Sequence, residues 1–262
     1  MEQVAGDIRN TRIGRTLWHG PVGHVVRNTW VVTRYALGSH RATFPLLRLT
    51  PPRRPALVRT GIDACIEGLP KSANSYGQIV FLMQNPDARL AHHVHVPMQV
   101  TRAVRLGIPC AILIREPLPT LTSLMIASEN GFYEEILFRM YIDYYGRVAA
   151  VREQVAICRF DEVLEDASVI AARLNQRCGT QFNCEPVSGE VAEKAKATVD
   201  SIIRRQRKPP WKSATPNQHK ERLKASVRER LGRNRHLPAA EAIYAELLDG
   251  VAGKRPTPNA RI

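Results

Sequence analysis

Short strand-like runs alternate with amphipathic segments along the middle of the chain. From residue 61 onward, apolar runs are separated by stretches whose apolar positions recur every three or four residues. The runs predict buried strands, and the stretches between them predict helices. The expected strands are 64–68, 90–94, 110–115 and 155–160, and the expected helices are 75–84, 98–106, 120–128 and 133–151. Such alternation is typical of an α/β fold, with a parallel β-sheet flanked by helices.

Helical patterns continue toward the C-terminus. Asp166 stands where it can cap a helix, and Gly179 stands where it can end one. A basic, proline-containing break at 204–212 interrupts the helices that follow. The helices expected here are 167–178, 190–204, 216–231 and 238–248. The C-terminal part is therefore predicted to be mainly helical.

Charge divides the 262-residue chain into three parts. The chain has 38 Lys and Arg against 24 Asp and Glu, a net charge of +14, of which residues 1–60 carry +8, 61–200 carry −4 and 201–262 carry +10. We expect a basic N-terminal elaboration over 1–60 packed on an α/β core at 61–185, and a basic helical extension of the same domain over 186–262. Basic ends favour binding to an anionic partner such as nucleic acid, an anionic membrane surface or an anionic substrate. The alternative interpretation is that these basic residues are simply exposed to solvent.

Composition bears on class and location. With 44% hydrophobic and 24% charged residues, the chain is not wholly disordered, collagen-like or coiled-coil. The five cysteines form no CxxC pair and indicate reduced thiols, and Cys65, Cys110 and Cys158 lie in apolar runs where a thiol is usually buried. No signal-like apolar core follows the N-terminal arginines, and the longest charge-free run, 72–86, is too polar for a membrane span. The expected location is the cytoplasm, with peripheral membrane contact left open.

The first chemical motif follows the first expected strand. There, a turn of small residues containing Lys71 leads into a helix. The first turn of a helix has unpaired N–H groups and the positive end of the helix dipole, and a lysine adds a full charge, so this arrangement favours a phosphate-like anion. Pro70 stands where a Walker A loop needs glycine, which disfavours an ATPase. The alternative interpretation is a surface turn with a solvated lysine.

The segment PKSANSY at 70–76 resembles the phosphosulfate-binding loop of sulfotransferases that use 3′-phosphoadenosine 5′-phosphosulfate (PAPS), whose usual pattern is Pro-Lys-Ser-Gly-Thr-Thr-Trp. Ala73 replaces the family glycine, so the loop must form without that residue's conformational freedom. Asn74 replaces a threonine. The resemblance implies that the cofactor is held by Lys71, Ser72, Ala73, Asn74, Ser75 and Tyr76.

A second motif follows the third expected strand. Arg115 is followed by Pro117, and Ser123 comes eight residues after the arginine. A guanidinium at the end of a strand can donate two hydrogen bonds to a phosphate, and a serine hydroxyl in the helix that follows adds another donor. The spacing resembles the second cofactor signature of the same family, which implies that Arg115 and Ser123 hold the 3′-phosphate of PAPS. The alternative is a structural arginine paired with Glu116 or Asp143.

Three histidines stand between these motifs, in the segment HHVHVP at 92–97. The resemblance places His95, followed by an aliphatic residue and Pro97, on the family's catalytic base, and His93 on a family lysine. Metal binding is a rival interpretation, since His93 and His95 would share one face of a strand. No further ligand with suitable spacing accompanies them, so no metal is expected.

Two further segments fit the same family. The run 155–166 resembles the strand and acidic turn that precede a helix, with Phe160 expected to be buried and Asp161 and Glu162 expected to cap or pair. A basic segment at the end of an expected helix is a further candidate for closing over the 3′-phosphate. Its members are Arg204, Arg205, Arg207 and Lys208.

The resemblance covers about residues 61–185 and implies a PAPS-dependent sulfotransferase. The sulfuryl group of PAPS would pass to a hydroxyl or amine by in-line transfer, with His95 as base and Lys71 stabilising the leaving phosphate. The acceptor is not identified: anionic, carbohydrate, lipid and phenolic acceptors all remain open, and no nucleic-acid partner is expected. The alternatives are a nucleic-acid or anionic-surface binding protein, and a sulfotransferase-like nucleotide-binding protein without turnover.

Overall fold

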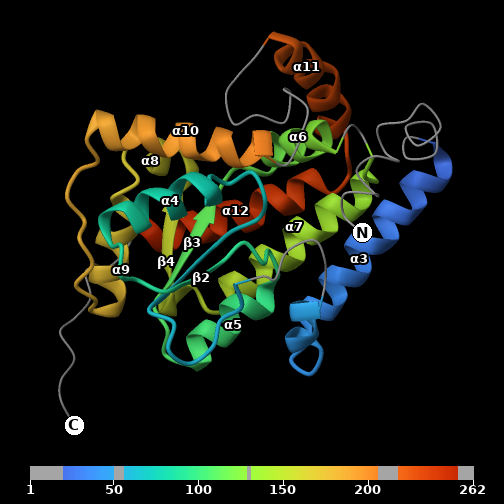
Figure 1. The fold of residues 1–262 in the computed structure, drawn as a ribbon. Helices are drawn as coiled ribbons and strands as arrows, with labels where there is room; N and C mark the ends of the chain where they lie inside the picture. Colours follow the sequence, from blue (N-terminus) through green and yellow to red (C-terminus); the bar gives the residue numbers. More distant parts are fainter. Residues whose placement is uncertain (1–19, 50–55, 129–130, 206–217, 253–262) are drawn as a thin grey trace.

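A four-stranded parallel sheet forms the centre of the protein. The computed structural model describes residues 20–49, 56–128, 131–205 and 218–252 (Figure 1). The strands lie side by side in the order β2-β1-β3-β4, and every neighbouring pair is parallel. Their bounds are β1 Ala64–Glu67, β2 Leu90–His92, β3 Cys110–Ile114 and β4 Ala156–Arg159. The predicted α/β class, with a parallel sheet flanked by helices, is confirmed.

Helices cover both faces of this sheet. Each helix predicted from residue 61 onward is present, with its ends shifted by a few residues. Glycine in the left-handed conformation ends α9 at Gly179 (φ 68°), and the carboxylate of Asp166 accepts the N–H of Ser168 just before that helix, as predicted. The helices are α3 Pro21–Ser39, α4 Asn74–Gln84, α5 Pro97–Arg105, α6 Pro117–Ala127, α7 Glu134–Ala149, α8 Phe160–Glu165, α9 Val169–Cys178, α10 Gly189–Arg205, α11 Gln218–Gly232 and α12 Leu237–Ala252, with 3-10 turns η1 Phe44–Leu49 and η2 Arg152–Gln154.

The strands are buried on both faces because their residues alternate between two apolar clusters. On β3, Cys110 and Ile112 belong to the cluster under α5 and α7, whereas Ala111 and Leu113 belong to the cluster under α4 and α9. This period of two puts successive side chains on opposite faces of the sheet. The three strand cysteines, including Cys110, are buried and unpaired, as predicted. The continuous apolar runs in the sequence therefore correctly predicted strands of a parallel sheet.

The N-terminal part contains a long helix, α3, that the hydrophobic pattern did not predict. It packs on η1 and α5. The Asn28 amide donates to the Gly131 carbonyl at 2.9 Å and accepts the Tyr133 N–H at 2.8 Å, while the Tyr35 hydroxyl donates to the Asp143 carboxylate at 2.8 Å. Polar contacts thus fix α3 to the start and middle of α7.

The C-terminal helices also lie against the core. Helix α10 packs on α4, α11 on α6, and α12 on α7 and α6 (Figure 1). In the part of the chain that the structure describes, no helix is long and apolar enough to cross a membrane.

Strand order makes the chain connections diverge at the carboxyl end of β1. The chain leaves β1 toward β2 on one side and reaches β3 on the other, and ligands of open α/β sheets bind where the connections diverge in this way. Gly68 follows β1 at this point. A Cβ atom on Gly68 would lie 2.3 Å from the Leu113 carbonyl oxygen of β3, so only glycine allows the two chains to come this close.

Replacing Gly68 tests this close approach. Gly68→Ala should lower the free energy of unfolding by more than about 2 kcal/mol, because the new methyl group would overlap backbone atoms of β3, which cannot move without disturbing the sheet. Gly189→Ala is the control, since a Cβ atom there meets nothing within 4 Å. Urea unfolding followed by circular dichroism would measure both variants, and equal stabilities would contradict the close contact.

Candidate functional site

The turn between β1 and α4 leaves backbone donors without a helical acceptor at the carboxyl end of β1. Lys71 and Ala73 both adopt left-handed backbone conformations, with φ of 77° and 66°. The first intrahelical bond of α4 runs from Gly77 N–H to the Ala73 carbonyl, so the three preceding N–H groups have no acceptor within the helix. Ala73, the residue before the helix, supplies no side-chain cap. The turn therefore adopts left-handed conformations at Lys71 and Ala73 although neither residue is glycine.

Two predicted loop residues turn their side chains inward. Ser72 is fully buried, with its hydroxyl oxygen 3.5 Å from that of Tyr145. Asn74 is nearly buried, and its amide donates to the Leu69 carbonyl at 2.7 Å and the Gly68 carbonyl at 3.3 Å. These side chains hold the shape of the turn, and what Asn74 can offer a ligand is its backbone N–H.

The two other loop residues lie on opposite sides of the helix start. The Ser75 hydroxyl is 2.9 Å from Nε2 of His93, which joins the turn to the histidine segment. Tyr76 is partly buried, and burial raises its pKa, with the ammonium group of Lys196 on α10 acting in the opposite direction. The loop is thus anchored on both sides by segments distant in sequence.

Arg115 joins the second predicted motif to the first. Its guanidinium donates to the Lys71 carbonyl at 3.0 Å and lies over the Phe160 ring, 3.9 Å from the ring centroid. Phe160 is partly exposed, so the expectation of a buried ring is wrong, and the guanidinium covers one face of the ring. Burial lowers the pKa of Arg115, with the carboxylate of Glu116 acting in the opposite direction. The turn and this arginine are therefore neighbours at the carboxyl ends of β1 and β3.

The remaining predicted residues have different outcomes. Ser123 lies on α6 and is nearly buried. Asp143, which the sequence offered as an alternative ion-pair partner for Arg115, instead pairs with Arg147 and accepts the Tyr35 hydroxyl.

As predicted, Glu162 both caps and pairs: it accepts the N–H of Arg159 and pairs with Arg173. In the basic cluster, Arg207 and Lys208 lie outside the described residues, as do the side chains of Arg204 and Arg205.

Strand β2 ends at His92, so the expectation that His93 and His95 share one face of a strand is wrong. Both adopt the left-handed conformation, each with φ of 58°. The cause is Glu67, a fully buried residue of β1, whose carboxylate accepts the N–H of Val94 at 2.7 Å and of His95 at 3.1 Å. Among the described residues, no group of three or more His, Cys, Asp or Glu is arranged to hold a metal ion.

Sequence analysis did not identify Glu67, although a single carboxylate inside a buried strand was the available signal. Burial raises its pKa to about 7, against the opposing effect of the backbone N–H groups that it accepts and of Arg34. Arg34 of α3 donates to the Val94 carbonyl at 3.2 Å, so both groups hold the same short segment. That segment carries His95.

The contacts of His95 fix which ring nitrogen carries its proton. Nδ1 lies 2.7 Å from the Gly68 carbonyl oxygen, which can only accept, so Nδ1 bears the hydrogen and Nε2 keeps its lone pair. Burial lowers the pKa of His95 to about 4, with smaller effects of Arg34 and His92 in the same direction, so the ring is neutral at pH 7. A neutral imidazole with a free Nε2 can accept a proton.

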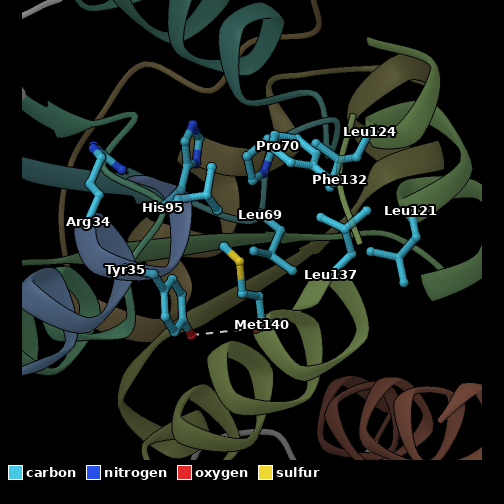
Figure 2. Close-up of a pocket in the computed structure, with 11 residues that line it drawn as sticks. Arg34, Tyr35, Leu69, Pro70, His95, Leu121, Leu124, Phe132, Leu137 and Met140 are labelled. Atoms are coloured by element: carbon cyan, nitrogen blue, oxygen red, sulfur yellow. Dashed lines mark hydrogen bonds between the residues drawn. The ribbon is translucent and has the colours of Figure 1, made fainter. Parts of the chain in front are cut away.

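A cavity of about 150 Å³ adjoins His95, enclosed by α3, α6, α7 and the turn after β1. Figure 2 shows Arg34 and His95 toward one end of this cavity and leucines toward the other. Its lining is mostly apolar. The residues that line it are Val31, Arg34, Tyr35, Leu69, Pro70, His95, Leu121, Leu124, Phe132, Leu137 and Met140.

No family model, curated protein or solved structure matches the chain.

Glu67 and His95 make opposite contributions to the pH dependence of stability. Glu67 keeps its native proton up to about pH 7, whereas an unfolded glutamate loses its proton near pH 4.3, so its contribution to stability falls as pH rises between these values. His95 stays neutral down to about pH 4, whereas an unfolded histidine is protonated below about 6.5, so its contribution falls as pH drops. In the wild type the two effects nearly cancel.

Single substitutions should expose each effect. Relative to wild type, Glu67→Gln should show a free energy of unfolding that rises with pH between about 4 and 7, by up to about 1.4 kcal/mol per pH unit. His95→Asn should show the reverse trend; asparagine tolerates the left-handed backbone, and its amide can donate to the Gly68 carbonyl. Urea unfolding across this range would measure both slopes. Differences from wild type that do not vary with pH would contradict the assigned protonation states.

Proposed function

We propose that the protein is a PAPS-dependent sulfotransferase with a P-loop-like nucleotide-binding core, in which residues 61–185 hold the cofactor. The observation that carries the proposal is the convergence of three segments on one turn. Arg115 donates to the Lys71 carbonyl, and His95 donates to the Gly68 carbonyl. The carboxyl end of β1 is therefore surrounded by two cations, Lys71 and Arg115, and by the candidate base His95.

The turn has the chemistry that a phosphosulfate requires. Left-handed residues and the start of α4 expose backbone N–H groups, while Lys71 supplies a mobile positive charge. Arg115 is partly desolvated, which strengthens its attraction for a phosphate, and we assign it to the 3′-phosphate together with Ser123. PAPS, when bound, supplies the activated sulfuryl group.

His95 would act as the base. Its Nε2 accepts the proton of the acceptor hydroxyl, while Lys71 and the N–H groups after Ser72 stabilise the negative charge that develops on the leaving phosphate. A pKa of about 4 makes His95 a weak base in the free protein. The negative charge of a bound nucleotide favours the imidazolium form, so binding raises the pKa of His95 toward the useful range.

The cavity beside His95 limits what the acceptor can be. Its volume of about 150 Å³ and its apolar lining suit a hydroxyl carried on a compact apolar body, such as one ring or a branched alkyl group. A carbohydrate would leave several hydroxyls unpaired against leucine and methionine side chains. We therefore propose an apolar alcohol or phenol as the acceptor.

Substitutions at the cofactor residues should weaken nucleotide binding. Lys71→Ala and Arg115→Ala should each raise the dissociation constant of 3′-phosphoadenosine 5′-phosphate by roughly 10- to 100-fold, since a hydrogen bond to a charged group contributes about 1.5–3 kcal/mol. His95→Asn should bind normally and lose sulfate transfer. Calorimetry and a radiolabelled sulfate assay would measure binding and turnover.

Matched controls are exposed residues of the same types, Lys194→Ala and Arg105→Ala. Wild-type protein that fails to bind the bisphosphate would refute the proposal. Normal binding without transfer to any acceptor would instead favour a nucleotide-binding relative that has lost turnover. Full activity in His95→Asn would contradict the assignment of His95 as the base, without affecting the assignment of the cofactor residues.

Filling the cavity should weaken binding of the acceptor and leave binding of the nucleotide unchanged. Met140→Phe adds a ring to the lining and should raise the KM for an apolar alcohol such as a simple phenol by about tenfold or more, with bisphosphate binding unchanged. Met140→Leu conserves volume and should behave like wild type. Steady-state transfer assays would measure both variants. Equal KM values in the two would place the acceptor elsewhere.

A further inference from the structure

Helix α3 turns an uncharged, largely apolar face to solvent. Side chains at positions 22, 25, 26, 29, 30 and 33 follow helical spacing and lie on one side of the helix. All six are exposed, including Val22 at 68%, Val25 at 53% and Trp30 at 43%. We call this surface the α3 outer face; it comprises Val22, Val25, Val26, Thr29, Trp30 and Thr33.

The polarity of α3 is inverted relative to a helix of a soluble domain. Its buried residues are Gly23, Asn28, Gly38 and Ser39, while valine and tryptophan face outward. Large apolar side chains are normally found inside, and contiguous apolar patches on monomers usually mark an interaction site. Polar bonds of Asn28 hold the helix to the core, so the outward orientation is built into the fold. Figure 1 shows α3 along one edge of the molecule.

The described chain on either side of this face is basic. From residue 20 to residue 62, the described residues contain five arginines and no Asp or Glu. Two of these arginines, Arg41 and Arg48, are exposed just beyond α3 and on η1, which packs against α3. Leu46 and Leu49 of η1 are also exposed, at 48% and 80%. The partner of this region must therefore accept both apolar side chains and positive charge.

We propose that the α3 outer face docks on an anionic lipid bilayer, with the helix lying in the plane of the interface. Valine and tryptophan side chains would enter the boundary between headgroups and acyl chains, and Arg41 and Arg48 would lie among anionic headgroups. A second copy of the same surface is a poorer partner, because the α3 outer face has no acidic residue to pair with Arg41 and Arg48. Nucleic acid would match the charge and leave the valines exposed.

Vesicle sedimentation of the full-length chain tests the apolar part. Wild type should bind vesicles of phosphatidylcholine with about 30% phosphatidylserine far more tightly than pure phosphatidylcholine. The double variant Val25→Ser/Trp30→Ser should bind about tenfold more weakly or worse, because it removes apolar area from the interface. The control is Leu106→Ser/Leu164→Ser, whose wild-type side chains are 42% and 50% exposed elsewhere on the surface and whose loss should not matter.

A second pair of variants tests the charge. Arg41→Gln/Arg48→Gln should weaken binding to the anionic vesicles by roughly 30-fold, since each arginine near such a surface contributes about fivefold. Arg105→Gln/Arg139→Gln removes two exposed arginines from α5 and α7 and should bind like wild type. Raising salt from about 0.1 M to 1 M should weaken wild-type binding, because screening shortens the reach of the charges.

Three results would overturn the proposal. One is no wild-type binding to the anionic vesicles at low salt. Another is equal binding by Val25→Ser/Trp30→Ser and its control, with unchanged thermal unfolding in both. The third is a stable dimer in sedimentation velocity that the same double variant dissociates, which would assign the face to a second copy. None of these measurements depends on sulfate transfer.

Discussion

The buried carboxylate of Glu67 determines the geometry around the end of β1. An ionisable carboxyl group inside an apolar sheet is costly to bury, and the cost is partly offset by the N–H groups of Val94 and His95 that donate to it. Those bonds pull the chain after β2 away from the sheet ladder and into a tight path past Gly68. The Nδ1 atom of His95 then meets the Gly68 carbonyl, and His95 is one of the residues that line the cavity. The bonds from Arg34 to the Val94 carbonyl and from His95 to the Gly68 carbonyl hold the same path.

Backbone strain is concentrated at the same place. Among the described residues, the non-glycine residues with positive φ are Lys71, Ala73, His93 and His95. Left-handed conformations cost such residues roughly 1–2 kcal/mol each, so surrounding contacts must hold them. Arg115, Asn74, Ser75 and Glu67 provide those contacts. Strain of this kind is typical of functional loops held in place by a rigid scaffold.

The sheet and most helices were predictable because buried parallel strands are continuous apolar runs and the helices between them are amphipathic. The resemblance assigned Lys71 and Arg115 to one cofactor, and the structure places both at the carboxyl ends of the adjacent strands β1 and β3. Helix α3 was not predictable, because its apolar residues face outward and its buried ones are glycine, asparagine and serine. The end of β2 at His92 was missed because Glu67, distant in sequence, sets it.

Helix α7 contacts both halves of the proposed site. Its Tyr145 hydroxyl accepts the Leu69 N–H at 3.3 Å and donates to the Leu113 carbonyl at 3.0 Å, and its Tyr141 hydroxyl donates to the Arg115 carbonyl at 2.7 Å. The same helix supplies Leu137 and Met140 to the cavity. In the proposed sulfotransferase, cofactor and acceptor would therefore both bind against residues that α7 holds, and any coupling between their affinities would be equal in both directions.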